Sequence, residues 1–237
     1  MFSNKLIARV MLLAASAVFL VPTAHAQKRA AGFASDDDAF LALRDASRKG
    51  DAVRAADIAS KLGNYSIPSY VDYYQLRPRI KDASPTEVLA YLNKYSGSAI
   101  ADRLRNDWLL EIGKRRDWVT FDEQYPLFEL NDDTQLKCYA LMSKAQKGMN
   151  VAVDARALLT VPKNYGEGCV ALIGMLMENS QFNEDDLWAQ IRLAAETGST
   201  DFVRRLVPFT GIDDGSLVTA MEKPALITSK GCLLYTS

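Results

Sequence analysis

The feature that most constrains this chain is an apolar periodicity with helical spacing, which recurs from about residue 36 onward. Apolar residues fall at i, i+3, i+4 and i+7 in Val88, Tyr91, Leu92 and Tyr95, a spacing that places them on one face of a helix. Similar stripes are Leu104, Trp108 and Ile112; Trp118, Phe121 and Tyr125; Val151, Ala155, Leu158 and Leu159; Leu187, Ile191, Ala194 and Ala195; and Phe202, Leu206 and Phe209. No stretch has the sustained alternation of a half-buried strand. The pattern predicts about ten or eleven helices of roughly 10 to 16 residues.

Polar residues and glycines stand where these helices are expected to begin and end. Ser84-Pro85-Thr86-Glu87 predicts a capping box with proline at the first helical position. Clusters of Asp, Glu and Asn at 36–38, 131–133 and 183–186, and the pair Asp213-Asp214, favour helix starts, where free N–H groups and the helix dipole attract negative charge. We therefore interpret these clusters as caps rather than catalytic carboxylates. The expected stops are Gly50, Gly63, Gly97, Gly148 and Gly198.

Short connections make successive helices antiparallel neighbours, and a long series of such pairs stacks into a curved solenoid more readily than into a closed bundle. The amino-acid sequence contains no strict repeat, so the prediction of a solenoid rests on the pattern of helices and turns. With 49% apolar residues the chain has material for a continuous core. We expect one elongated domain over residues 36–231, with a softer joint near residues 161–168, where proline, asparagine and glycine cluster.

The N-terminal residues have the pattern of a secretory signal. Lys5 and Arg9 precede an uncharged run at 10–21, and Ala24-His25-Ala26 predicts cleavage before Gln27. The alternative, a membrane anchor, needs about 20 apolar residues, and this run has about a dozen. We expect residues 1–26 to be removed, residues 27–35 to form a disordered leader, and the mature protein to reside in the periplasm.

Composition excludes several functions. The only histidine lies in the signal, so the mature chain has none for Ser/His or Cys/His catalysis, and zinc binding is disfavoured. Acid–base chemistry would have to use Asp, Glu, Lys or Tyr. Cleavage leaves 26 Lys and Arg against 29 Asp and Glu, without a dense basic block, so nucleic acid is not an expected partner. No phosphate loop or metal-ligand run appears, and no cofactor or metal is expected.

Cys138 and Cys169 are the two cysteines between the signal and the C-terminal tail. A pair in an exported protein favours a disulfide, because the periplasm is oxidising. It would join the helix predicted at 136–147 to the helix after next and contribute roughly 3 to 4 kcal/mol. The alternative is two buried free thiols that pack as small apolar groups.

Aromatic residues are concentrated between residues 65 and 125, namely Tyr65, Tyr70, Tyr73, Tyr74, Trp108, Trp118, Phe121 and Tyr125. Such rings can stack on sugars, but their spacing fits helix packing equally well. We favour a core role for Trp108 and Trp118.

The last six residues, 232–237 (CLLYTS), match the translation of a transposon terminal repeat used to fragment sequencing libraries. We interpret them as a sequencing artefact; the alternative is a natural frayed tail.

Several ordered blocks resemble the N-terminal helical region of soluble lytic murein transglycosylases. They are 67–76 (IPSYVDYYQL), 84–88 (SPTEV), 91–95 (YLNKY), 101–109 (ADRLRNDWL), 116–121 (RDWVTF) and 136–140 (LKCYA), with a second cysteine at Cys169. The resemblance spans about residues 38–215. It implies an all-α fold, a U-shaped, right-handed-type α-superhelix (solenoid) of antiparallel helix pairs, with a disulfide between Cys138 and Cys169.

In that family a separate C-terminal domain cleaves the MurNAc–GlcNAc bond of peptidoglycan to 1,6-anhydro products, using a Glu followed by Ser. This sequence has no Glu-Ser pair and no Gly-Leu-Met-Gln block, so no catalytic residue is carried over. The resemblance implies a region that positions glycan strands or other cell-wall enzymes and is inactive alone. The competing hypothesis is a non-enzymatic helical-repeat adaptor that holds a periplasmic protein.

Overall fold

A computed structural model describes residues 32–211, and in that range the chain forms eleven α-helices, four short 3₁₀ helices and no strand. The α-helices are α1 (Asp36–Arg48), α2 (Ala52–Lys61), α3 (Pro68–Leu76), α4 (Pro85–Lys94), α5 (Ala99–Arg115), α6 (Trp118–Gln124), α7 (Thr134–Gln146), α8 (Ala152–Leu158), α9 (Glu167–Glu178), α10 (Glu184–Glu196) and α11 (Thr200–Leu206). The 3₁₀ helices are η1 (Arg77–Arg79), η2 (Tyr125–Leu127), η3 (Pro162–Asn164) and η4 (Val207–Thr210). The all-α prediction is confirmed over this range.

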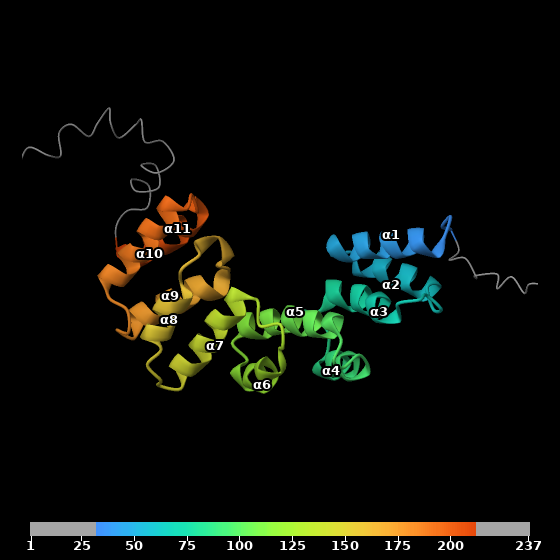
Figure 1. Ribbon diagram of the computed structural model, residues 1–237, viewed down its shortest axis with the longest axis horizontal. Helices are drawn as coiled ribbons and strands as arrows, with labels where there is room; N and C mark the ends of the chain where they lie inside the picture. Colours follow the sequence, from blue (N-terminus) through green and yellow to red (C-terminus); the bar gives the residue numbers. More distant parts are fainter. Residues whose placement is uncertain (1–31, 212–237) are drawn as a thin grey trace, which may run out of the picture.

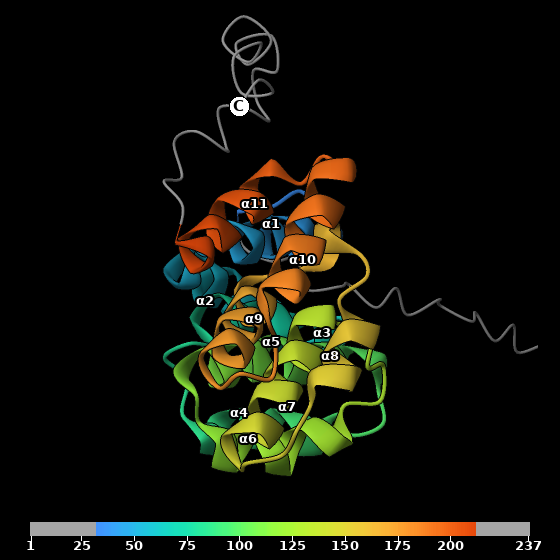
Figure 2. The same cartoon turned by 90° about the vertical axis from the view of Figure 1, so that its left-hand side faces the viewer.

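The helices follow one another along an open arc (Figure 1). Helices α1 to α3 form one end, α10 and α11 form the other, and the 17-residue α5 crosses the middle. Helices α4 and α6 lie on the lower, outer side of the arc, and the opposite side is open (Figure 1). Seen from the side, α10 and α11 rise above α7 and α8 (Figure 2). Each helix therefore packs chiefly on helices close to it in sequence, as α1 does on α2 and α7 on α9.

Two clusters of buried apolar side chains hold the arc together. The smaller one joins α1, α2 and the start of α3, and the larger one runs from the end of α3 to η4. Tyr74 packs against both clusters and links them. Trp108 of α5 is only 1% exposed, which confirms its predicted core role, whereas Trp118 is half-buried at the edge of the larger cluster.

Local capping explains where most helices begin. Asp133 caps α7, with its carboxylate accepting from the N–H groups of Gln135 and Leu136, and Asn183 and Asp186 close a full capping box on α10. Of the two hydrogen bonds in the capping box predicted at Ser84, only one forms. Ser84 accepts from the Glu87 N–H, but the Glu87 carboxylate pairs with Arg79 instead of returning to the backbone of Ser84. A charged guanidinium is a stronger donor than a backbone amide, and it takes the carboxylate.

Gly50, Gly97, Gly148 and Gly198 follow helix ends with φ between 68° and 81°, as expected of C-terminal stops. Gly63 also follows a helix but does not have a positive φ. The predicted joint at 161–168 contains η3 and the start of α9, and Pro162 and Tyr165 within it are buried.

No helix within residues 32–211 is long and apolar enough to cross a membrane. The predicted signal, most of the predicted leader, Asp213-Asp214 and the predicted artefact at 232–237 lie outside the described residues.

Candidate functional surfaces

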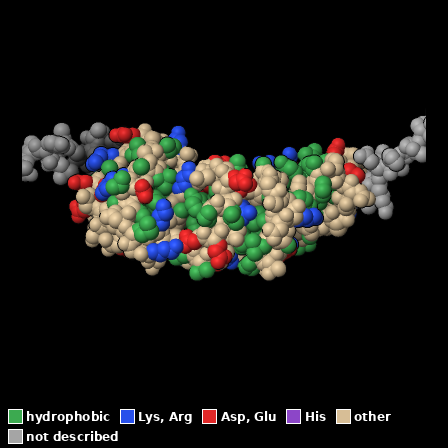
Figure 3. Space-filling model, turned by 60° about the horizontal axis from the view of Figure 1, so that its bottom comes forward, with side chains coloured by type: hydrophobic (Ala, Val, Ile, Leu, Met, Phe, Trp, Pro, Cys, Tyr) green, Lys and Arg blue, Asp and Glu red, His purple; other side chains and the backbone are tan. Residues whose placement is uncertain are grey.

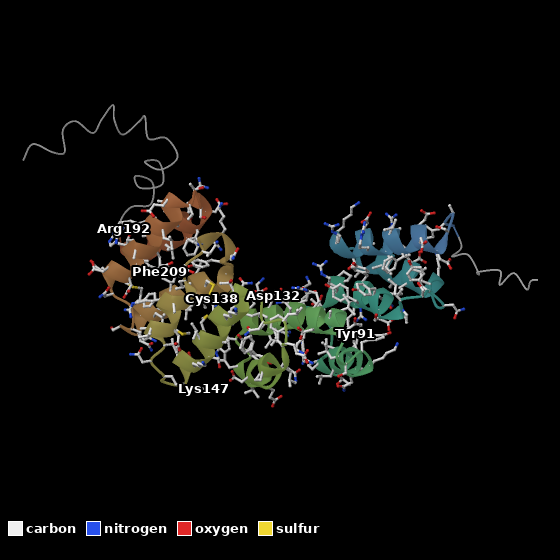
Figure 4. The ribbon with its side chains drawn as sticks, viewed as in Figure 1. Tyr91, Asp132, Cys138, Lys147, Arg192 and Phe209 are labelled. Atoms are coloured by element: carbon white, nitrogen blue, oxygen red, sulfur yellow. A yellow bond between two sulfur atoms is a disulfide. The ribbon has the colours of Figure 1, made fainter. Side chains whose placement is uncertain are left out.

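The two cysteines form a disulfide that ties α7 to α9 (Figure 4). Cys138 and Cys169 lie 5.0 Å apart at Cα, and both are fully buried. The backbone N–H of Gly168 donates to the side-chain oxygen of Gln135 at 3.1 Å, which fixes the start of α9 against α7 beside the bridge. Of the two alternatives left open by the sequence, the structure has the disulfide.

A tyrosine next to the bridge is enclosed by three helices. The ring of Tyr139 packs on Gly113 of α5 and Gly168 of α9, where a Cβ would stand 2.4 Å and 2.9 Å from ring atoms. Its hydroxyl donates to the carboxylate of Glu167. Burial, and then the bond to Glu167, raises the pKa of Tyr139, so the hydroxyl remains a donor throughout the physiological range.

Arg116 completes this cluster from the end of α5. It occupies the left-handed region at φ 62° and donates to the Glu167 carboxylate at 2.9 Å. Its guanidinium lies 5.8 Å from the Trp118 ring centre and 5.3 Å from that of Tyr139. We name Arg116, Tyr139 and Glu167, with the disulfide, the α5–α7–α9 junction. It is a built structural junction, because every charged or polar tip in it already has a protein partner.

The acidic clusters singled out in the sequence occupy helix starts. Ser35 caps α1, and residues 36–38 fill its first turn. In the second cluster Asp133 caps α7, while Asp132 pairs with Arg103 at 3.2 Å. Asp132 lies toward the open side of the arc (Figure 4). The third cluster forms the box on α10. The interpretation as caps is confirmed at all three.

A largely buried carboxyl group outside these clusters belongs to Asp107 of α5. Asp107 accepts from the Tyr73 hydroxyl at 2.8 Å and from Arg77 Nε at 3.3 Å. Burial raises the pKa of Asp107, and the two donors oppose that rise. Asp107 lines none of the three grooves described below. Its arrangement fits a link between α3 and α5 better than proton transfer to a bound molecule.

The aromatic residues do not assemble into one stacking surface. Tyr65 stacks on Phe40, with centroids 4.8 Å apart, and donates its hydroxyl to Asp37. Phe121 is fully buried and stacks on Tyr125 at 5.2 Å, a residue of η2. Tyr70 is 38% exposed at the start of α3. Most of these rings thus pack helix against helix, and Tyr125 alone among them lines one of the grooves described next.

Three open grooves lie between successive elements, with volumes of about 350, 370 and 300 Å³. The first, which we name the outer groove, is lined by α6, η2, α7 and α8. Its lining residues are Asp122, Tyr125, Pro126, Lys137, Ala140, Leu141, Lys144, Asp154 and Leu158. The second groove is lined by α4, the start of α5 and η2. The third is lined by α3, η1 and α4. Figure 3 views the outer side of the arc, where apolar side chains lie among charged ones.

Residues 32–211 hold no group of three or more His, Cys, Asp or Glu placed to bind a metal. Sequence reasoning also missed the α5–α7–α9 junction and the grooves. The one signal of the junction in the sequence was a glycine inside a predicted helix, Gly113.

The described residues form an all-α scaffold, and its candidate binding sites are the three grooves. No family model and no curated protein matches the chain. Among solved structures, the chain is similar to the X-ray structure of an inactive mutant of the lytic transglycosylase Slt from Pseudomonas aeruginosa. The TM-score is 0.52 and the identity 25%, over 81% of this chain and 32% of that one. The chain therefore spans about a third of the solved protein's length.

Proposed function

We propose that this chain is the N-terminal helical region of a periplasmic lytic transglycosylase. The whole enzyme would cleave the MurNAc–GlcNAc bond of peptidoglycan to 1,6-anhydro products in cell-wall turnover. The observation that carries the proposal is the likeness to Slt, which combines 25% identity with a shared fold over 81% of the chain. In this proposal the arc is a right-handed α-superhelix built of antiparallel helix pairs.

The proposal assigns catalysis to a further domain of the same polypeptide. The chain contains no Glu-Ser pair and no Gly-Leu-Met-Gln block, and its three acidic clusters are engaged at helix starts. The helical region then holds glycan strands or other cell-wall enzymes near the active site, and alone it is inactive.

Export to the periplasm is part of the same proposal. The pattern of residues 1–26 supports it, and so does the disulfide, since such bonds persist in oxidising compartments.

The test is co-sedimentation of the chain from Gln27 onward with purified murein sacculi, followed by analysis of the supernatant for 1,6-anhydro-muropeptides. We expect the chain to sediment with sacculi and to release no anhydro product. An unrelated all-α protein of similar net charge serves as the control. A chain that stays in the supernatant and retains a periplasmic protein would favour the adaptor hypothesis.

A further inference from the structure

The outer groove has an apolar floor and is lined by two lysines and two aspartates. The floor and one wall consist of Ala140, Leu141 and Leu158, and of Tyr125 and Pro126 from η2. Leu141 is 8% exposed, so the floor of the groove is closely packed by protein atoms beneath the surface.

Of the two aspartates of the groove, Asp122 is engaged by protein donors. The Asp122 carboxylate accepts from the Ser143 hydroxyl at 2.8 Å and from Lys147 at 2.5 Å. Asp154 lies in the first turn of α8, where the helix dipole favours a negative charge. Asp122 is thus paired outside the groove, with Lys147, and not with Lys137 or Lys144.

The two lysines of the groove, Lys137 and Lys144, form no ion pair with any residue in the range 32–211. They are seven residues apart on one face of α7, which places them about 10 Å apart along the helix axis. By contrast Lys147, at the outer end of α7, is already paired (Figure 4). Two free cations with apolar surface between them match a ligand with two carboxylates and small apolar groups.

An extended peptide covers about 10 Å in three residues, so a short acidic peptide matches both the spacing and the charge. We propose that the outer groove binds the acidic stem peptide of murein, with carboxylates at Lys137 and Lys144 and alanyl methyl groups on Leu141. This inference rests on the proposed function for the source of the peptide. It adds a peptide-binding site on the outer side of the arc.

The experiment measures binding of two soluble probes by calorimetry: a disaccharide–tetrapeptide, and the same disaccharide without the peptide. The chain from Gln27 onward is compared with the double variant Lys137→Gln/Lys144→Gln. The matched control, Lys49→Gln/Lys81→Gln, removes the same charge at exposed lysines remote from the groove. Circular dichroism checks that each variant is folded.

We expect the peptide-bearing probe to bind the parent chain and the control equally, and the groove variant at least about tenfold more weakly. The probe without peptide should not distinguish the three proteins. Equal binding of the tetrapeptide probe by all three, or no binding of it, overturns the inference. If the parent chain still sediments with sacculi in that case, the proposed function stands without it.

A third probe, an acidic amphipathic helical peptide, tests the alternative that the groove binds a helix of a protein partner. Binding of that helix with dependence on Lys137 and Lys144, without binding of the muropeptide, would overturn the stem-peptide assignment in favour of a protein partner.

Discussion

Tyr139 is enclosed on two sides by glycines and anchored at its tip by Glu167. The ring is 1% exposed, so it has no free space into which it could move. Glycine at 113 lets α5 approach the ring to a distance that no other residue would allow. The contact between Gly113 and the Tyr139 ring is thus one place where α5 and α7 pack closely.

We predict that Gly113→Ala destabilises the protein by about 1 to 3 kcal/mol, because the new Cβ would stand 2.4 Å from a ring that cannot withdraw. Chemical denaturation measures the change. Gly63→Ala is the matched control, since no atom lies within 4 Å of its Cβ and its φ is not positive, and it should change stability by less than about 0.5 kcal/mol. Equal effects of the two substitutions would contradict the account of Tyr139.

At the same scale, Asp186 serves both the cap of α10 and an ion pair to α8. Arg156 donates to its carboxylate from Nε at 2.6 Å and from a second nitrogen at 2.7 Å, and the bidentate pair lowers the pKa of Asp186. Asp186 is 15% exposed and Arg156 48% exposed, so solvent weakens the pair.

A group whose pKa is lowered by folding stabilises the protein above its ordinary pKa, about 4 for Asp, and that stability is lost as pH falls through the lowered value. We predict that the parent chain loses more stability than Asp186→Asn as the pH falls from 6 to 3. Thermal unfolding across this range measures it. Parallel pH profiles for the two proteins would rule out the contribution.

At the scale of elements, the helix starts could be predicted because capping is local. Asp133 and Asn183 lie next to the N–H groups that they accept from. The Glu87 carboxylate was assigned wrongly because its partner, Arg79, lies before the helix, in η1. The contact from Arg116 to Glu167 joins residues 51 positions apart, and no local pattern indicates it. The sequence therefore predicted the helices and the cysteine pair, but neither the junction nor the grooves.

The disulfide acts at this scale because it joins α7 to α9 around α8. We predict that Cys138→Ala/Cys169→Ala lowers the free energy of unfolding by about 3 to 4 kcal/mol, since the bridge closes a segment of 31 residues. Guanidinium unfolding with and without reductant measures it. The double variant should show no response to reductant, whereas an unchanged midpoint in the variant would mean that the bridge does not stabilise the fold.

At the scale of the whole molecule, the arc has no single centre. Its core runs along the chain in two clusters joined at Tyr74, and its grooves open between successive elements. Such a shape suits a surface that holds an extended polymer or a partner, rather than a pocket that encloses one reacting bond. This shape supports the proposal that catalysis belongs to a further domain.

The central proposal is that this region is part of a lytic transglycosylase, and sequencing the genomic locus tests it most directly. We predict that the gene encodes, in the same protein, a domain containing Glu-Ser and Gly-Leu-Met-Gln. A natural stop codon directly after the codons for residues 232–237, with no such domain, would contradict it.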